Sequence, residues 1–234
     1  MSAKNPYAAR RKELLRHMKT VGVDALLVSN RRNVFYLSGF RGDDSMLLVR
    51  PGRAVLLTDG RYTEQAEEET REVDILSRKK GMMPTAGLVA QKAGIKTLGV
   101  EAESLTVAQA EDLKAALGRT ALKFLRGMVQ RQRIVKDASE IAVIRRAVTI
   151  TEQAFLQTLS HVRVGMTERE LAHILDRTMI ELGAEGPAFD TIVAAGERGS
   201  LPHAIPTNRR IRSGEAILFD WGARLEGYCA DLTR

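Results

Sequence analysis

Cysteine is almost absent from this sequence, which holds a single residue of that type, Cys229. An intramolecular disulfide is therefore excluded, which suits a reducing cytoplasm. Long apolar runs are also missing, because the longest uncharged stretch, GMMPTAGLVAQ, contains Gly and Pro and falls far short of the ~20 residues that a membrane helix needs. The polar, charged N-terminus does not resemble a secretory signal. We therefore expect a cytoplasmic protein with no membrane partner.

Aromatic residues are scarce as well, at 5% of the chain. The net charge of +7 could indicate a nucleic-acid partner. The basic residues are scattered, however, and are not interleaved with the aromatic side chains on which single strands stack. Nucleic acid is therefore not the expected partner.

What is present is an alternation of helical and extended patterns over the first half of the chain. Alternating strands and helices predict an α/β domain with a mixed sheet. The turn PGR between two apolar runs predicts a hairpin. The expected strands are residues 25–29, 46–50, 54–59, 73–77 and 97–101, and the expected helices are 7–20, 60–70 and 106–117.

The pattern changes near residue 134, which divides the chain into domains 1–133 and 134–234. The second domain opens with a long helix that ends near Leu159, with Asp137 or Ser139 as its cap. A second helix begins at a capping box formed by Thr167 and Glu170 and stops at Gly183. From residue 187 onward the pattern is extended.

Two aspartates stand inside the last two apolar runs, 216–222 and 228–233. If the intervening RLEG is a four-residue hairpin loop, Asp220 lies directly opposite Asp231 on one side of the sheet. Two carboxylates that close repel each other unless a cation lies between them. The pattern therefore suggests a site for one or two divalent metal ions.

Other interpretations of these residues stay open. One aspartate could cap a turn or pair with Arg224 or Arg234, and Asp231 could be exposed to solvent. Cys229 has the same strand parity as Asp231, but a thiolate beside two carboxylates is an odd mixture for hard metals. We expect Cys229 to be a small packed side chain.

One histidine has an unusual setting in the segment SLPHAIPTNRRI. His203 lies between Pro202 and Pro206, which stiffen the loop on both sides. A histidine held there can donate or accept a proton near neutral pH. It could equally be an ordinary surface histidine.

Taken together, these motifs resemble one family. The segments VKDASEIAVIRRA, GMTERELA and GAEGPAFDTIVAAGERGSLPHAIPTNRRIRSGEAILFDWGARLEGYCADLTR resemble the first part of the pita-bread domain of Xaa-Pro dipeptidases (prolidases) and aminopeptidases P. The segments NVFYLSGFRG and LLTDGRYTEQA resemble the N-terminal domain that creatinases and prolidases share. The expected fold is therefore a creatinase-type α/β domain with a mixed sheet, followed by a truncated pita-bread domain of α+β type.

The resemblance implies a metal-dependent peptidase that hydrolyses Xaa-Pro bonds. Asp220 would match the first metal ligand of the family and Asp231 the second, while His203 would match the catalytic histidine that contacts the substrate. It also implies two divalent ions, Mn²⁺, Co²⁺ or Zn²⁺, together with a proline-containing peptide substrate and a homodimer.

The sequence departs from the family pattern at one point. The family site also uses a histidine and two glutamates further along the chain, and these have no counterpart before Arg234. We therefore expect a truncated chain, inactive if the site stays incomplete. The alternative is a non-catalytic pita-bread module that binds protein or nucleic acid. A metal-free creatinase-type hydrolase is disfavoured by the two aspartates.

Overall fold

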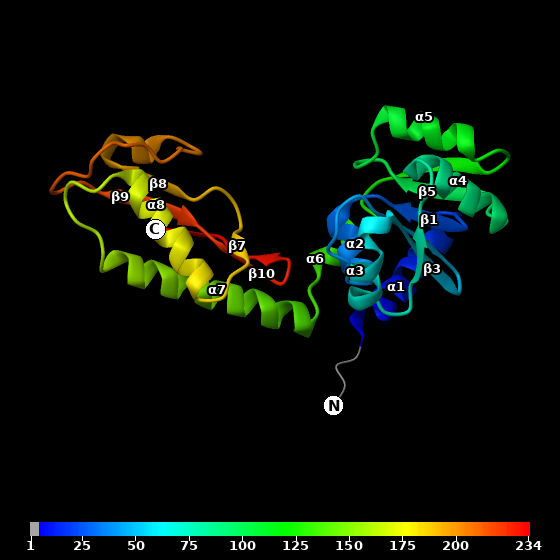
Figure 1. Cartoon of the computed structure of the whole chain (residues 1–234), viewed down its shortest axis with the longest axis horizontal. Coiled ribbons are helices and arrows are strands. Elements are labelled where there is room, and N and C mark those ends of the chain that lie inside the picture. Colours follow the sequence, from blue (N-terminus) through cyan, green and yellow to red (C-terminus); the bar gives the residue numbers. More distant parts are fainter. Residues whose placement is uncertain (1–4) are drawn as a thin grey trace. The chain divides into compact units, whose positions relative to one another are not determined.

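The computed structural model describes residues 5–234, which form two compact units (Figure 1). The first unit ends at Val135 and the second begins at Lys136. None of the helices in the described part of the chain combines the length and the hydropathy needed to cross a membrane.

The first unit is built on a six-stranded sheet with the strand order β4-β3-β2-β1-β5-β6. The pairs β1–β2 and β2–β3 are antiparallel, whereas β1–β5, β3–β4 and β5–β6 are parallel. The predicted mixed sheet is therefore confirmed. The strands are β1 (Ala25–Val28), β2 (Met46–Arg50), β3 (Arg53–Thr58), β4 (Asp74–Ser77), β5 (Thr97–Glu101) and β6 (Ala121–Leu125).

Helices cover both faces of this sheet (Figure 1). They are α1 (Pro6–Thr20), α2 (Arg31–Ser38), η1 (Gly60–Tyr62), α3 (Thr63–Glu69), α4 (Met82–Lys92), α5 (Val107–Ala116) and α6 (Gln130–Ile134). Helices α1, α2 and α3 pack on one face, while α4 and α5 pack on the other. Each face has its own apolar cluster, because strand residues alternate between the two sides.

Helix α4 was not predicted, because its segment contains Pro84. Proline is tolerated there since it stands in the first turn, where the backbone N–H has no partner within the helix. Gly87 lets this helix approach α5 closely, because a Cβ atom at Gly87 would lie 2.5 Å from the Cβ of Ala116.

Two helices dominate the second unit, and both begin at capping boxes. In α7 (Ala138–Leu159), the Asp137 side chain accepts from the Glu140 backbone, and the Glu140 side chain accepts in return from the Asp137 backbone. Thr167 and Glu170 do the same for α8 (Glu168–Glu181), which confirms the predicted box.

The strands of this unit form two three-stranded sheets, β11-β10-β7 and β12-β9-β8. They are β7 (Gly186–Pro187), β8 (Ile192–Ala195), β9 (Ile217–Trp221), β10 (Ala223–Leu225), β11 (Tyr228–Cys229) and β12 (Leu232–Thr233), with the short helix η2 (Gly196–Ser200) after β8. Trp221 anchors the core between the sheets and α7, because its ring is buried and stacks on Phe155 at 4.5 Å between ring centroids. The burial of such large rings is a major source of core stability.

Candidate metal centre

The hairpin that carries the two aspartates has a register different from the predicted one. Asp220, the last residue but one of β9, is paired with Thr233 and, on its other side, with Ile192. The Thr233 hydroxyl donates a hydrogen bond to Asp220 Oδ1 at 3.1 Å. The prediction that Asp220 and Asp231 lie directly opposite each other was therefore wrong, by two residues.

The cause is the turn between the strands. Leu225 pairs with Tyr228, so only Glu226 and Gly227 form the loop, whereas RLEG was expected to form all of it. Both residues have positive φ angles, 48° and 79°, as a type I′ turn requires. This turn is compatible with the right-handed twist of the strands and fixes the register of the ladder.

The observed register still leaves the two aspartates on one face of the hairpin. The strand pairing is interrupted near Gly222, between β9 and β10. The pairs on its two sides, Trp221–Leu232 and Arg224–Cys229, follow the same register. Trp221 is buried on the core side, whereas Asp220 is half-buried and Asp231 is exposed. In such a ladder Asp220 and Asp231 are diagonal neighbours, for which Cα atoms are typically ~7–8 Å apart.

Helix α7 holds the part of this hairpin around Gly222 through the buried residue Thr151. The Trp221 indole N–H donates to the Thr151 carbonyl, and the Ala223 backbone N–H donates to the Thr151 hydroxyl, each at 2.9 Å. A second contact lies nearer the turn, where the Tyr228 hydroxyl donates to the buried carboxylate of Glu140 at 2.9 Å. The strands on either side of Gly222 are thus fixed to one rigid helix.

Cys229 does not occupy the packed position that we expected. Its side chain is exposed, and it is a free thiol. The reason is strand parity, because Cys229 lies on the same outward face as Asp231 and Thr233 while Ala230 takes the buried position between them.

His203 lies outside this hairpin, in the loop between η2 and Thr207. Its side chain is exposed, and its backbone adopts a φ of 55°, a left-handed conformation that residues other than glycine rarely adopt. Such a conformation persists only where the surrounding structure enforces it.

Glu168 fixes the chain on both sides of this loop. Its carboxylate is fully buried and accepts hydrogen bonds from the Ala195 backbone at 2.9 Å, from Arg198 Nε at 3.1 Å and from the Thr207 backbone at 2.9 Å. The Thr207 hydroxyl donates to it as well, at 2.6 Å. Arg198 in turn donates to the carbonyl of Ile205 at 2.8 Å. We call Glu168, Arg198 and Thr207 the loop clamp, because one carboxylate ties both ends of the segment that carries His203.

The electrostatics of the clamp favour a charged carboxylate. Burial by itself would raise the pKa of Glu168, but the hydrogen bonds from Thr207 and Ala195 and the charge of Arg198 lower that pKa below its ordinary value. Sequence reasoning missed this residue, because a glutamate in the first turn of a helix carries no sign of partners nearly 30 and 40 residues away.

A second ion pair closes the loop before β9. The Arg209 guanidinium binds Glu215 through two hydrogen bonds, of 2.9 and 2.5 Å. This bidentate contact lowers the pKa of Glu215 to about 2 and raises the pKa of Arg209 above its ordinary value.

The lowered pKa of Glu215 predicts an acid-dependent loss of stability. Because the folded protein holds this carboxylate deprotonated, the stabilisation is complete above the ordinary pKa of 4.5 and is lost as the pH falls towards 2. We expect urea unfolding midpoints to fall over this pH range, and to fall less steeply in Glu215→Gln. Equal pH slopes in the two proteins would contradict the prediction.

Asp220 and Asp231 can supply part of the ligand set of a metal centre. Two carboxylates are hard oxygen donors of the kind that divalent cations take in bridged sites. Within residues 5–234, no group of three or more His, Cys, Asp or Glu side chains is placed to enclose an ion. Asp220 and Asp231 therefore fit a metal as two members of a larger ligand set.

Comparisons with known proteins agree with the two-unit architecture. The Creatinase/Prolidase N-terminal domain model matches residues 10–135, and the model of metallopeptidase family M24 matches residues 142–234. An uncharacterised peptidase of Bacillus subtilis is 33% identical over 92% of this chain and 61% of its own length. A Xaa-Pro dipeptidase of Pyrococcus horikoshii is 32% identical over 95% of this chain and 62% of its own. The structure of a Xaa-Pro dipeptidase from Bacillus anthracis superposes with a TM-score of 0.93, at 31% identity, over 97% of this chain and 64% of that one.

The fold and these matches define a protein with a creatinase-type first domain and a second unit related to metallopeptidase family M24. The chain belongs to the Xaa-Pro dipeptidase (prolidase) and aminopeptidase P family, and its second unit corresponds to part of the pita-bread domain. It spans less than two thirds of the length of the relatives described above. Metallopeptidase family M24, whose model matches the second unit, is by its name a family of metal-dependent peptidases.

Proposed function

We propose that this chain forms part of the active site of a metal-dependent peptidase that hydrolyses Xaa-Pro bonds. The observation that carries the proposal is the pair Asp220 and Asp231, which share one face of a short hairpin one diagonal step apart. Both are carboxylates on the outward side of strands whose other side is core, where a structural role would not require charge.

In this proposal each residue has a distinct task. Asp220 and Asp231 would hold the metal, one or two ions of Mn²⁺, Co²⁺ or Zn²⁺, as two of its ligands. Thr233 orients the Asp220 carboxylate through its hydroxyl. His203 contacts the substrate and donates or accepts a proton. The bound metal supplies Lewis-acid polarisation of the scissile carbonyl.

The substrate class and the assembly are part of the same proposal. The relatives named Xaa-Pro dipeptidase support a substrate with proline after the scissile bond. We also propose a homodimer and a cytoplasmic location.

Metal binding is tested on the chain itself. We expect Mn²⁺, titrated by loss of the free-ion electron paramagnetic resonance signal, to bind in the ~0.1–1 mM range of sites with few protein ligands. Asp220→Asn and Asp231→Asn should each abolish this binding, because each removes one of two charged donors. Glu181→Gln, which removes an exposed acid paired with Arg177, is the matched control and should bind as the unmodified chain does. Binding that survives both aspartate substitutions would overturn the ligand assignment.

Activity is tested in a chimera in which this chain replaces the matched region of the Pyrococcus horikoshii dipeptidase. We expect Mn²⁺-dependent cleavage of Ala-Pro and none of Ala-Ala. Asp220→Asn should lower kcat/KM by at least ~100-fold. His203→Ala should lower kcat while leaving Mn²⁺ affinity unchanged, since the imidazole acts on the substrate. A folded, metal-loaded chimera without Ala-Pro cleavage would refute the proposed activity.

A further inference from the structure

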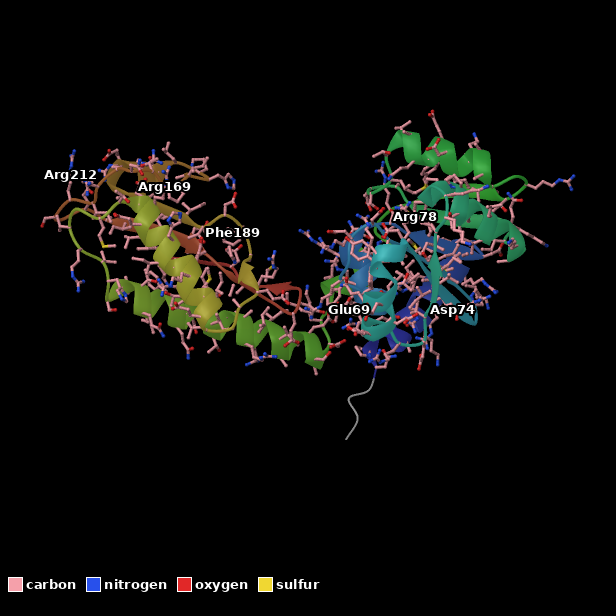
Figure 2. All side chains as sticks on the ribbon, in the orientation of Figure 1. Glu69, Asp74, Arg78, Arg169, Phe189 and Arg212 are labelled. Atoms are coloured by element: carbon pink, nitrogen blue, oxygen red, sulfur yellow. The ribbon has the colours of Figure 1, made fainter. Side chains whose placement is uncertain are left out.

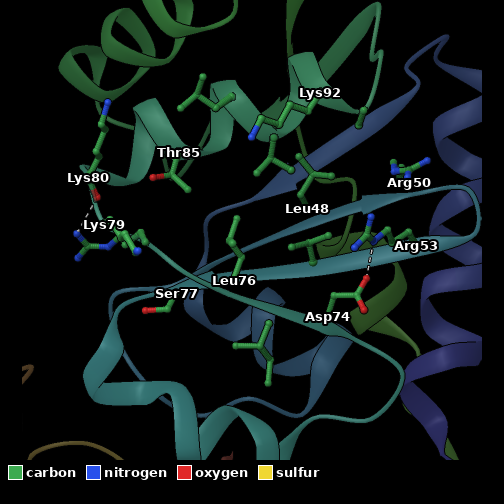
Figure 3. A pocket seen from close by; sticks show the side chains of 16 residues that line it. Leu48, Arg50, Arg53, Asp74, Leu76, Ser77, Lys79, Lys80, Thr85 and Lys92 are labelled. Atoms are coloured by element: carbon green, nitrogen blue, oxygen red, sulfur yellow. Dashed lines mark hydrogen bonds and ion pairs between the residues drawn. The ribbon is translucent and has the colours of Figure 1, made fainter.

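A groove with a volume of about 600 Å³ lies between helix α4 and strand β4 of the first unit (Figure 3). It lies beside the contact of α4 with β3, next to the last strand of the sheet. Leu76 of β4 is 38% exposed and Leu88 of α4 is 45% exposed. Aliphatic side chains that face water across an open groove are typical of a binding surface.

The lining of this groove is strongly basic. It holds six cations and a single acid, Asp74, which is already paired with Arg53 at 2.5 Å. Arg78 is paired with Asp44 and Asp59. The remaining four form no ion pair with any residue in the described part of the chain, and they are Arg50, Lys79, Lys80 and Lys92.

The four unpaired cations are separated along the groove. Lys79 and Lys80 stand at one end, beyond the last residue of β4, Arg50 stands at the other, and Lys92 lies between them on α4 (Figure 3). Asp74 is the first residue of β4 and Arg78 follows its last residue, so the two labelled side chains mark the ends of this strand (Figure 2). The groove therefore has an aliphatic middle and a positive charge at each end.

The strand beside the groove is also an open edge. β4 is the last strand in the order of the sheet, so one side of its backbone has no strand partner in the described structure. Asp74, Leu76 and Ser77 are exposed along it. An edge of this kind accepts an added strand through its free N–H and C=O groups.

The charges decide which strand it accepts. Lysines beside an edge repel a second copy of the same edge, which disfavours self-pairing. The groove contains no aromatic side chain on which nucleic-acid bases could stack. An acidic segment is complementary to the four unpaired cations, and its aliphatic residues fit between Leu76 and Leu88.

We propose that this basic edge groove, formed by β4, α4 and the four unpaired cations, binds an extended acidic peptide segment of a partner protein. The segment pairs with the backbone of β4 and places an aliphatic side chain between Leu76 and Leu88. Its carboxylates contact Lys79 and Lys80 at one end, Arg50 at the other, and Lys92 on the α4 side. This surface lies in the first unit and is independent of the peptidase function proposed above.

The test uses a fluorescein-labelled peptide, Asp-Glu-Leu-Glu-Val-Glu-Asp, with blocked ends and no proline, so that it is no Xaa-Pro substrate. We expect saturable binding in fluorescence anisotropy that weakens as salt is raised, because the contacts include charge pairs. The same peptide with N-methyl groups on alternate backbone nitrogens keeps its charge but loses strand pairing, and it should bind at least ~10-fold more weakly.

The variant Lys79→Glu with Lys80→Glu should weaken binding of the acidic peptide by at least ~10-fold. Lys114→Glu with Arg119→Glu makes the same change of charge at exposed positions outside the groove and should leave the affinity unchanged. Unchanged binding in the first variant, equal binding of the N-methylated peptide, or tighter binding of a single-stranded oligonucleotide would each overturn the proposal. Far-ultraviolet circular dichroism checks that both variants are folded.

Discussion

Glu168→Ala is expected to lower the free energy of unfolding of the second unit by about 3 to 5 kcal/mol, because it removes a buried charge whose partners stay behind. Arg198 would lose its ion pair, and the backbone N–H groups of Ala195 and Thr207 would lose their acceptor. Unfolding in urea is measured by tryptophan fluorescence. Trp221 is the single tryptophan of the chain, so this signal reports on the second unit alone.

The control for this change is Glu170→Gln, two residues along the same helix. Glu170 is exposed, and its carboxylate accepts hydrogen bonds from its capping partner Thr167, an arrangement that Gln can also make, so its replacement should cost far less than that of Glu168. Limited proteolysis supplies a second measurement, since loss of the clamp should expose the His203 loop to cleavage in Glu168→Ala and leave it protected in Glu170→Gln. Similar losses of stability in the two variants would show that the loop clamp contributes no more to stability than the capping box does.

Gly222→Ala is the second substitution with a large expected effect. A Cβ atom at Gly222 would lie 1.9 Å from the carbonyl oxygen of Ala230 and 2.7 Å from its carbonyl carbon. Both are backbone atoms of the opposite strand, so the clash cannot be relieved by turning a side chain. We expect a loss of about 3 kcal/mol in the urea unfolding of the second unit.

Gly199→Ala is the matched control, because its added carbon would meet its nearest neighbour, Leu218 Cβ, at an ordinary 3.6 Å. It should change the free energy of unfolding by no more than about 0.5 kcal/mol. Gly222→Ala should also weaken Mn²⁺ binding at Asp220 and Asp231, because it separates the strands that carry them. Unaltered stability of Gly222→Ala would mean that the two strands are not packed as tightly as the structure has them.

The sequence alone was sufficient to predict elements that depend on contacts between residues close in the chain. The cap candidates Asp137 or Ser139 and the capping box at Thr167 predicted the starts of the two long helices, because a cap and its partners lie within three residues of each other. The structure selects Asp137 as the cap of the first. The hairpin of β2 and β3 was identified from the PGR turn between two apolar runs. Helix α2 was missed because it is short, and its cap, Asn30, precedes two arginines and gives no apolar periodicity.

The sequence alone was insufficient to predict features that depend on the exact turn type or on contacts between distant residues. The register of the last hairpin was predicted wrongly because Glu226 occupies a left-handed turn position that sequence rules assign to Gly, Asn or Asp. The sequence therefore favoured the four-residue loop RLEG over the two-residue loop that the structure has. The loop clamp could not be foreseen at all, since Glu168 meets Thr207 only after α8 and the following strands have packed.

The two-residue turn at Glu226 and Gly227 also limits how this hairpin can change in evolution. If the loop keeps two residues, an added residue slides one strand by a single step and turns Asp231 towards the core while Asp220 stays outside. Adding two would restore the shared orientation. Natural variants should therefore differ in length at this point by even numbers, and an odd difference should coincide with loss of the acidic pair.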